Sequence, residues 1–254
     1  MRPLGNGHFP VVSVLPRFTT ALAELAEPGL GGSEALPLKL SVAAARTLSA
    51  DAAGISVMDV LRVPLGASDA DAAVAERLQI TVGDGPCIHA YNTGQPMVAD
   101  QTQLAQNWPI FNDRLVAETH IRSVASLPLQ TSKTRLGAID LHWLSPRGVA
   151  TLSLDEAVEL ADHIAEVLLG QPTVATIHGV TAPGWVDAEP AQRRMQVWQA
   201  VGMLNVACGL GNLDAIAILR AYAYSHDTDI DTLASEVLAG LVPLNDIAPQ
   251  PTTT

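Results

Sequence analysis

Three consecutive segments in the last third of the chain each place apolar residues at helical spacing, and short breaks separate them. Gly209 and Gly211 end the first segment, and Asp227 to Asp229 interrupts the pattern after the second. A helix with an apolar stripe must cover that stripe, so three such helices are expected to pack on one another. Residues 187–245 are therefore predicted to form an all-α three-helix bundle. The stripes are Val197, Val201, Leu204 and Cys208; Leu213, Ile216, Leu219 and Ala223; and Ile230, Leu233, Ala234, Val237 and Leu241.

Residues 35–170 combine helical and strand patterns. Apolar residues recur at helical spacing over 37–53, and apolar and polar residues alternate over 54–60. The patterns predict further strands over 80–82, 97–99, 123–130 and 136–143, and helices over 69–77, 87–93, 107–119 and from Ser153 onward. No long crossover connection suggests a parallel sheet. The expected fold is α+β, an antiparallel sheet flanked by helices.

Proline and glycine divide the chain further. Residues 1–34 hold repeated Pro and Gly and form an N-terminal extension with at most one short helix. Residues 171–186 contain Pro172, Gly179, Pro183 and Gly184, which makes this stretch the expected linker between the two folded parts. Residues 246–254 are expected to be a disordered tail.

The charge and hydropathy of the chain bear on whether it binds nucleic acids or membranes. The formal net charge is -12, and from Trp185 onward three arginines stand against eight acidic residues. This is a poor composition for non-specific binding to phosphates, although single-stranded loops can be recognised by a few arginines and an aromatic ring. No apolar run approaches the ~20 residues that span a bilayer, and the first residues lack a secretory pattern. The chain is expected to be cytoplasmic, with no membrane partner.

The cysteines and histidines give weak chemical signals. Cys87 and Cys208 lie in different predicted parts of the chain, so neither a disulfide nor a zinc site is expected. Cys87 follows a glycine turn and precedes His89 by two residues, a position that can favour a thiolate. A buried structural thiol is the preferred interpretation. The histidines show no metal-ligand spacing, and no catalytic residue, metal or cofactor is predicted.

The C-terminal bundle carries a specific combination of residues. Gln199-Ala200-Val201-Gly202-Met203-Leu204 is followed by Gly209, by Leu219-Arg220-Ala221-Tyr222-Ala223-Tyr224, and by Leu233-Ala234-x-x-Val237. This pattern, over about 55 residues, resembles the ANTAR domain of bacterial transcription-antitermination regulators. The resemblance implies a three-helix bundle that binds paired hairpins in nascent RNA. It departs from the family at Asn205 and in the acidic loop 227–229.

The ANTAR resemblance implies an RNA-binding face. Arg194 and Arg220 would contact phosphates or base edges, and Tyr224 would stack on a loop base. Small residues would allow close approach or support the face from within. The implied set is Arg194, Ala200, Gly202, Arg220, Ala223 and Tyr224.

The front part resembles a GAF domain over about residues 36–169. The resemblance is carried by Gly83-Asp84-Gly85-Pro86-Cys87, Trp108-Pro109-x-Phe111, Ser123-Val124-x-Ser126-x-Pro128-Leu129 and Gly137-Ala138-Ile139. GAF domains bind small molecules or serve as dimerisation platforms, so the resemblance implies a ligand pocket and a homodimer. The pocket candidates are Cys87, His89, Tyr91 and Asp140.

The leading hypothesis is a GAF-ANTAR regulator in which the GAF part controls access of RNA hairpins to the C-terminal bundle. One alternative is a cysteine-dependent GAF enzyme, similar to free-methionine sulfoxide reductases, with Cys87 as its reactive group. The other is a dimerisation or interaction module that has lost RNA binding, which the acidic C-terminal part favours.

Overall fold

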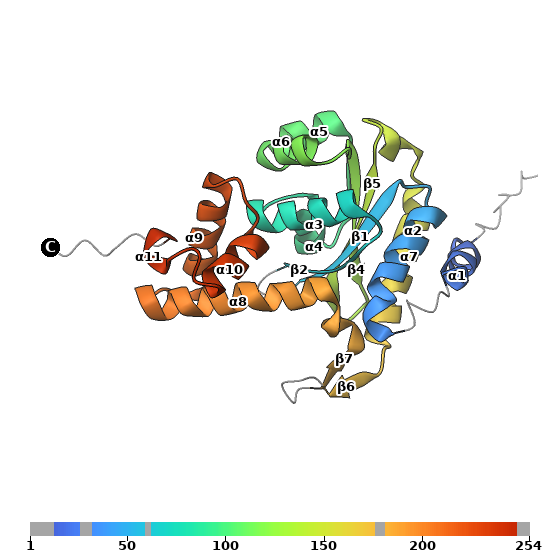
Figure 1. Ribbon diagram of the computed structural model, residues 1–254. Coiled ribbons are helices and arrows are strands. Elements are labelled where there is room, and N and C mark those ends of the chain that lie inside the picture. The colour runs from blue at the N-terminus through green and yellow to red at the C-terminus, as the bar shows by residue number, and fades with distance from the viewer. Residues whose placement is uncertain (1–12, 26–31, 59–61, 176–180, 248–254) are drawn as a thin grey trace, which may run out of the picture.

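The computed structural model describes residues 13–25, 32–58, 62–175 and 181–247. Its centre is a five-stranded antiparallel sheet in the order β2-β1-β5-β4-β3 (Figure 1). The strands are β1 (Ala52–Met58), β2 (Arg62–Ala67), β3 (Met97–Ala99), β4 (Ser123–Gln130) and β5 (Arg135–Trp143). The expected antiparallel α+β fold is confirmed. The alternating residues did not reveal β2, which is an edge strand that contains Pro64.

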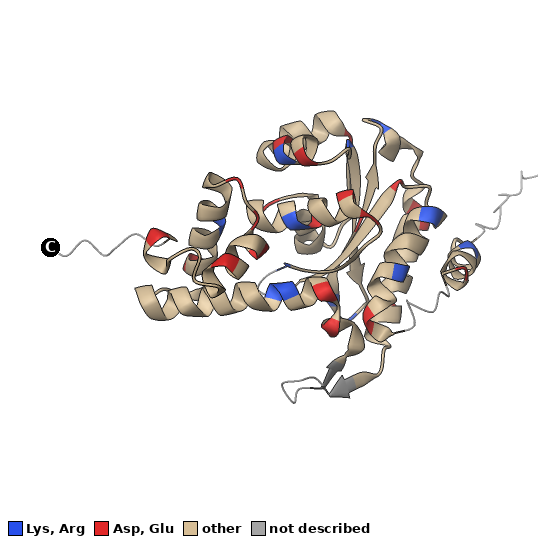
Figure 2. Cartoon of the chain, viewed as in Figure 1, with Lys and Arg blue, Asp and Glu red and all other residues tan. Residues whose placement is uncertain are grey.

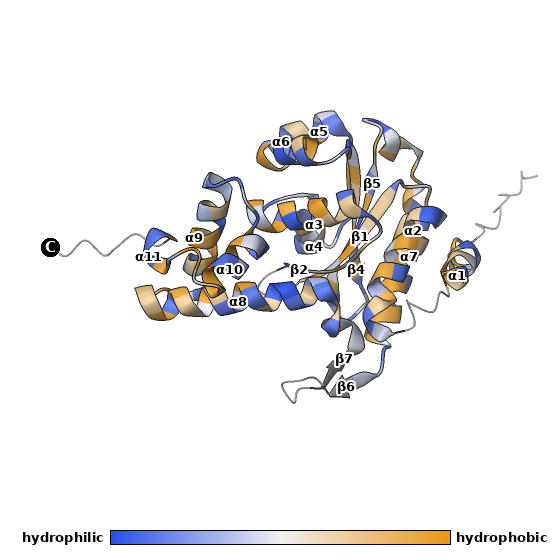
Figure 3. Ribbon diagram, in the orientation of Figure 1, coloured by the Kyte–Doolittle hydropathy of each residue, from blue (hydrophilic) through white to orange (hydrophobic). Residues whose placement is uncertain are grey.

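Helices α2 (Leu36–Thr47) and α7 (Leu154–Leu169) cover one face of the sheet. Their apolar faces meet the inward residues of β1, β4 and β5 in the largest core of the protein, which includes Leu40, Ile55 and Ile164. Figure 3 shows apolar residues on both helices where they approach the strands. The N-terminal helix α1 (Leu15–Ala23) adds Phe18 to the same core, and a 3₁₀ turn, Ser33–Ala35, precedes α2.

The opposite face of the sheet is covered by α3 (Ala70–Val82) and α4 (Pro86–Thr93). Helices α5 (Gln101–Asn107) and α6 (Pro109–Glu118) pack beside α3, around a smaller core that includes Leu104 and Phe111. A 3₁₀ turn, Gly148–Thr151, joins β5 to α7.

The strand predicted over 80–82 is wrong, because these residues form the last turn of α3. The helix runs on to Gly83, whose φ of 79° provides a left-handed C-cap. The buried Ile80 side chain packs against the C-terminal helices, so tertiary contact outweighs the local β propensity of three β-branched residues.

The segment expected to be a linker is partly structured. It contains a two-stranded hairpin of β6 (Thr173–Ala175) and β7 (Thr181–Pro183), followed by a 3₁₀ turn, Gly184–Asp187. Trp185 is buried in the core of the front part, and its Nε1 donates to the carbonyl of Leu168 at 3.2 Å. The turn therefore ties the C-terminal helices to α7.

The C-terminal part consists of α8 (Glu189–Cys208), α9 (Asn212–Ser225) and α10 (Ile230–Leu238), with a final turn, α11 (Leu244–Ile247). The all-helical bundle is confirmed, and its core contains the predicted stripes except Cys208, which is half-buried, and Leu213 and Leu241, which are exposed. The Asp229 side chain caps α10 by accepting from the backbone of Asp231 and Thr232. Of the expected disordered tail, residues 246–254, the first two belong to α11 and residues 248–254 lie outside the described residues. Residues 1–12 and 26–31 of the N-terminal extension also lie outside the described residues.

In the described part of the chain, no single helix is long and apolar enough to cross a membrane. Only α8 and α9 taken together reach that apolarity, with a bend of 108° between them.

Candidate functional site: a buried polar cluster and a docked helical bundle

The face of the sheet beneath α3 and α4 is polar, unlike the face beneath α2 and α7. Ser56 on β1 and Asp140 on β5 point to this side, together with Ser126 and His142, and all four are fully buried. Helix α3 adds Glu76 and Gln79, α4 adds Cys87, and β2 adds Arg62. We refer to Ser56, Arg62, Glu76, Gln79, Cys87 and Asp140 as the buried polar cluster.

Arg62 is the centre of this cluster. Its Nη2 lies 2.9 Å from Asp140 Oδ2 and 2.7 Å from Glu76 Oε2, while its Nη1 donates to the Glu76 carbonyl at 2.6 Å. Its Nε donates to Cys87 Sγ at 3.0 Å. The guanidinium fork thus joins β5, α3 and α4, which is the kind of site where arginine cannot be replaced by lysine.

Gln79 and Gly54 also shape the buried polar cluster. Gln79 Nε2 donates to Asp140 Oδ2 at 2.7 Å, and its Oε1 accepts from the Cys87 backbone N–H at 2.9 Å. A Cβ at Gly54 would lie 2.3 Å from Glu76 Oε1. Glycine on β1 therefore allows the Glu76 side chain to lie directly on the strand.

Burial controls the protonation of the cluster. It raises the pKa of Glu76 to about 8, with the Arg62 charge opposing that rise and Asp140 adding to it. Burial likewise raises the pKa of the Cys87 thiol, against the lowering effect of Arg62. His142 is kept neutral because burial lowers its pKa. The Glu76 carboxyl therefore holds a proton near neutral pH.

Several polar atoms on this face have no hydrogen-bond partner in the described structure: Asp140 Oδ1, Ser126 Oγ and both ring nitrogens of His142. Unpaired buried polar atoms are costly, because each has lost its hydrogen bonds to water without gaining a partner in the protein. The thiol of Cys87 is fully buried and occupied by Arg62, with Ser56 Oγ at 3.5 Å. No group of three metal-ligating side chains occurs in the described part of the chain.

The structure brings together two of the four residues expected in the GAF pocket. Cys87 and Asp140 belong to the buried polar cluster, but His89 and Tyr91 do not. His89 is exposed on α4 with its ring edge toward Trp108, and Tyr91 is half-buried beneath the Arg135 guanidinium. Helix α4 turns these two side chains away from the sheet.

Four members of the buried polar cluster were not among the predicted site residues: Ser56, Arg62, Glu76 and Gln79. Glu76 and Gln79 are three residues apart, a spacing that places them on one face of α3, but the helix predicted from the sequence ends at residue 77. Arg62 carries no comparable local signal, because its partners lie on other elements.

The six residues expected on the RNA face are not equally accessible. Ala200 and Ala223 are fully buried in the bundle core, where they can only support a surface. Arg194 is 1% exposed, and its Nη2 lies 3.0 Å from Asp231 Oδ2. An arginine enclosed in this way makes no contact with RNA in this arrangement. Gly202 is exposed, and a Cβ added to it would meet no atom within 4 Å beyond the backbone of its own helix.

The remaining two residues face the front part of the chain. Arg220 Nε donates to the Ile80 carbonyl at 2.8 Å, and its guanidinium lies against Gly83. The Arg114 guanidinium, on α6, lies 5.9 Å from the centre of the Tyr224 ring. Both residues are thus engaged by the α+β part.

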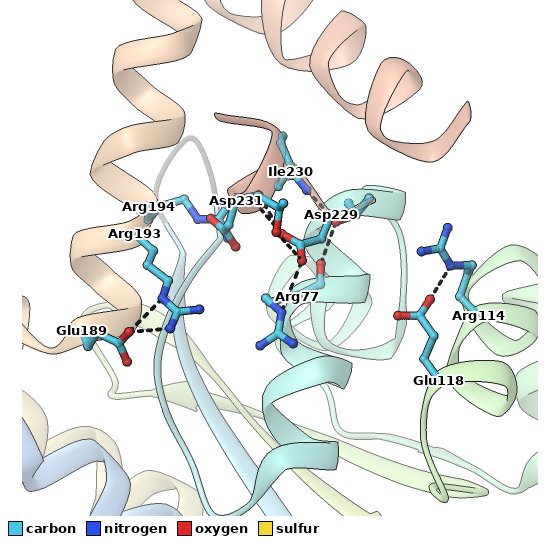
Figure 4. A network of polar contacts seen from close by, with 11 residues as sticks. Arg77, Arg114, Glu118, Glu189, Arg193, Arg194, Asp229, Ile230 and Asp231 are labelled. Atoms are coloured by element: carbon cyan, nitrogen blue, oxygen red, sulfur yellow. Dashed lines mark hydrogen bonds and ion pairs between the residues drawn. The ribbon is translucent and has the colours of Figure 1, made fainter. Parts of the chain in front are cut away.

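The acidic loop before α10 takes part in the same contact. Asp227 Oδ1 lies 3.2 Å from Arg114 Nη1. Asp229 Oδ2 lies 3.6 Å from Arg77 Nε (Figure 4). The Ile230 N–H donates to Thr81 Oγ1 at 3.3 Å. The bundle therefore docks on α3 and α6, and the loop that departs from the ANTAR pattern supplies acidic partners for front-part arginines.

A model of the GAF domain family matches residues 38–168, more than half of the chain. The chain belongs to the GAF domain family. Its GAF domain comprises the sheet and α2 to α7, and the buried polar cluster lies between the GAF sheet and its α3–α4 cover. The C-terminal bundle lies outside the matched residues.

Among solved structures, the chain is similar to the GAF domain from a phosphoenolpyruvate-protein phosphotransferase of Coxiella burnetii. The identity is 16% and the TM-score 0.42, over 60% of this chain and 88% of that chain. No curated protein matches the chain.

Proposed function

We propose that this protein is a signal-responsive regulator in which the GAF domain controls an ANTAR-like RNA-binding bundle. The observation that carries the proposal is the engagement of Arg220 and Tyr224 by the GAF domain, through Ile80 and Arg114. Arg220 is half-buried and Tyr224 is exposed. The ANTAR resemblance assigns both side chains to RNA contact. In the docked arrangement, hairpin RNA would have to displace the GAF domain from them.

Helix α3 provides a direct connection between sensing and docking. Glu76 and Gln79 face the buried polar cluster, whereas Arg77, Ile80 and Thr81 contact the bundle. A small molecule that displaced the partners of Glu76 or Gln79 would move the helix that holds the bundle. A ligand that binds the cluster more tightly in one arrangement, docked or undocked, therefore shifts the docking equilibrium toward that arrangement. The size of the shift is set by the difference between its two affinities.

An RNA gel shift tests this function. The RNA is a leader with two tandem hairpins, and the protein is the full chain or the variant Arg77→Ala/Ile80→Ala/Arg114→Ala, which changes only the GAF side of the contact. The variant is expected to bind at least tenfold more tightly, with an affinity that falls as salt rises. Arg46→Ala, an exposed GAF arginine away from the bundle, is the matched control. If neither protein binds at low salt, the RNA function is wrong.

A second candidate function, assembly of a homodimer through α8, has its own support. The chain has no charged residue from Met195 to Leu213, and Figure 2 shows the free end of α8 without coloured charges. Met195, Met203 and Val206 are exposed there, Val206 at 89%. Gly202 leaves room on the same side for a second helix to approach closely. A second copy of α8 matches this uncharged surface better than RNA does.

Light scattering distinguishes this candidate. The wild-type chain is expected to be a dimer, and Val206→Glu should shift it to a monomer, because a desolvated carboxylate would face its own symmetry mate. Gln192→Glu, near the other end of α8 and away from the Val206 end, is the comparison variant and should remain a dimer. A monomeric wild-type chain would contradict this candidate.

A further inference from the structure

A cleft of about 120 Å³ opens where β2, α3, α8 and α10 meet, and Glu76 of the buried polar cluster forms part of its wall. Gly66 and Ala67 of β2 form part of its wall, Arg77 of α3 lies on one side, and Arg193 of α8 and Asp231 of α10 lie on the other. Figure 4 shows Arg77, Arg193 and Asp231 converging from their three helices. The cleft thus has one wall from the GAF domain and one from the bundle.

Asp231, which lines the cleft, carries a buried hydrogen-bond acceptor. Asp231 is 8% exposed, and its Oδ2 is held by Arg194 at 3.0 Å. Its Oδ1 is buried and has no hydrogen-bond partner among the described residues. A buried carboxylate oxygen without a donor is unfavourable, and an ammonium group supplies three donors and a compensating charge.

The outer part of the cleft presents cations. Arg193 pairs with the exposed Glu189, and its side chain is 52% exposed. Arg77 is 30% exposed, and among the described residues its side chain pairs only with Asp229, at 3.6 Å. Each guanidinium therefore retains free N–H groups, and the two together can bind a carboxylate.

We propose that this junction cleft binds a small zwitterion, an α-amino acid in chemical class. Its ammonium group would donate to Asp231 Oδ1, and its carboxylate would accept from Arg77 and Arg193. The volume favours a compact molecule, because sites for larger ligands span roughly 300–1,000 Å³. The smallest amino acids fit this description, and a nucleotide does not.

A zwitterion in this position bridges the GAF domain and the bundle. It binds the docked arrangement, in which the two walls are together, and not an undocked one. Mass action then stabilises docking. We expect RNA to bind more weakly when the zwitterion fills the cleft, and this expectation rests on the proposed function. Binding of the zwitterion to the cleft does not rest on it.

The test is a titration of the full chain with glycine, alanine and serine at millimolar concentration, followed by thermal unfolding and by calorimetry. Acetate and methylammonium, at equal ionic strength, are the controls. Acetate carries only the carboxylate charge and methylammonium only the ammonium charge. At a hundredfold excess over Kd, one of the amino acids is expected to raise Tm by about 5–10 °C, with saturation. Acetate and methylammonium should shift it by less than a quarter of that.

Variants test whether the amino acid binds in the junction cleft. Arg193→Gln, at an exposed side chain that should not affect folding, is expected to weaken binding at least tenfold, and Asp231→Asn should do the same if it folds. Arg46→Gln, an exposed arginine on α2, should bind as the wild type does. The inference is overturned if none of the amino acids saturates, if acetate or methylammonium acts equally well, or if Arg193→Gln binds unchanged. Saturable binding by a chain that fails to shift RNA would instead refute only the RNA function.

Discussion

Arg194 Nη2 lies 3.0 Å from Asp231 Oδ2, and the two residues are 1% and 8% exposed. The pair connects the start of α8 to the start of α10, on the side of the bundle that faces β2. Its burial gives Arg194 a structural role in this arrangement, whereas the ANTAR resemblance implies a role in RNA contact. The two roles predict different behaviour on substitution.

Replacing Arg194 with methionine should lower the free energy of unfolding by about 3 kcal/mol, because Asp231 is then buried without a partner. The double variant Arg194→Met/Asp231→Leu should recover most of this loss, since no charge remains unpaired. Urea denaturation of the four proteins of the cycle measures the coupling. An exposed RNA-contacting arginine would instead give a change within about 0.5 kcal/mol.

Stability should depend on pH through Glu76. Its pKa is raised from 4.5 to about 8 by burial, so the folded state binds the proton more tightly than the unfolded state. The stabilisation is complete below the unfolded pKa and is lost as pH rises through 8. Between pH 6.5 and 7.5 the free energy of unfolding should fall by about 1 kcal/mol.

Glu76→Gln removes the titrating carboxyl group. The free energy of unfolding should then change little between pH 6.5 and 7.5. The buried His142, whose pKa is lowered from 6.5, contributes in the opposite direction, mainly below pH 7, and the raised pKa of Cys87 contributes near pH 8.5. Both residues are present in both proteins, so the difference between the wild-type and Glu76→Gln profiles, measured by denaturation from pH 6.5 to 8.5, isolates the carboxyl group. Parallel wild-type and Glu76→Gln profiles would show that Glu76 does not hold the proton.

Docking of the bundle should depend on Ile80, which belongs to the GAF helix α3 but packs into the bundle core. Ile80→Ala should cost about 3 kcal/mol and increase amide hydrogen exchange in α9 and α10. Ile110→Ala is the matched control, because Ile110 on α6 is 51% exposed and its loss should change stability by less than about 0.5 kcal/mol. Equal exchange in the two variants would argue against a docking role.

Thiol reactivity separates a regulator from a cysteine-dependent enzyme. Cys87 is buried and its pKa is raised, whereas Cys208 is half-buried at the end of α8. A thiol reagent should label Cys208 in the folded protein and Cys87 only after unfolding. Cys208→Ser should leave the folded chain unlabelled. Rapid labelling of Cys87 in this variant would support the enzyme alternative.

Part of the site was predictable from the sequence. The alternation along β5 puts Asp140 and His142 on the same face, and the glycine turn before Cys87 places that residue at the start of a helix. The arginine that organises the cluster was not predictable. Arg62 lies on an edge strand that contains Pro64, and its partners Glu76, Cys87 and Asp140 are 14, 25 and 78 residues away. Only the packing of α3 and α4 on the sheet brings them within hydrogen-bond distance.

The sequence by itself determined the elements whose signal is local: the amphipathic helices of the bundle, the alternating strands β1, β4 and β5, and the glycine that ends α8. These follow from periodicity and capping, which act over a few residues. The tertiary structure alone decided that α3 continues through Ile80, that Arg194 is enclosed by Asp231, and that Arg220 and Tyr224 face the GAF domain. Burial and ion pairing depend on residues far apart in the chain, and no local pattern encodes which of them will meet.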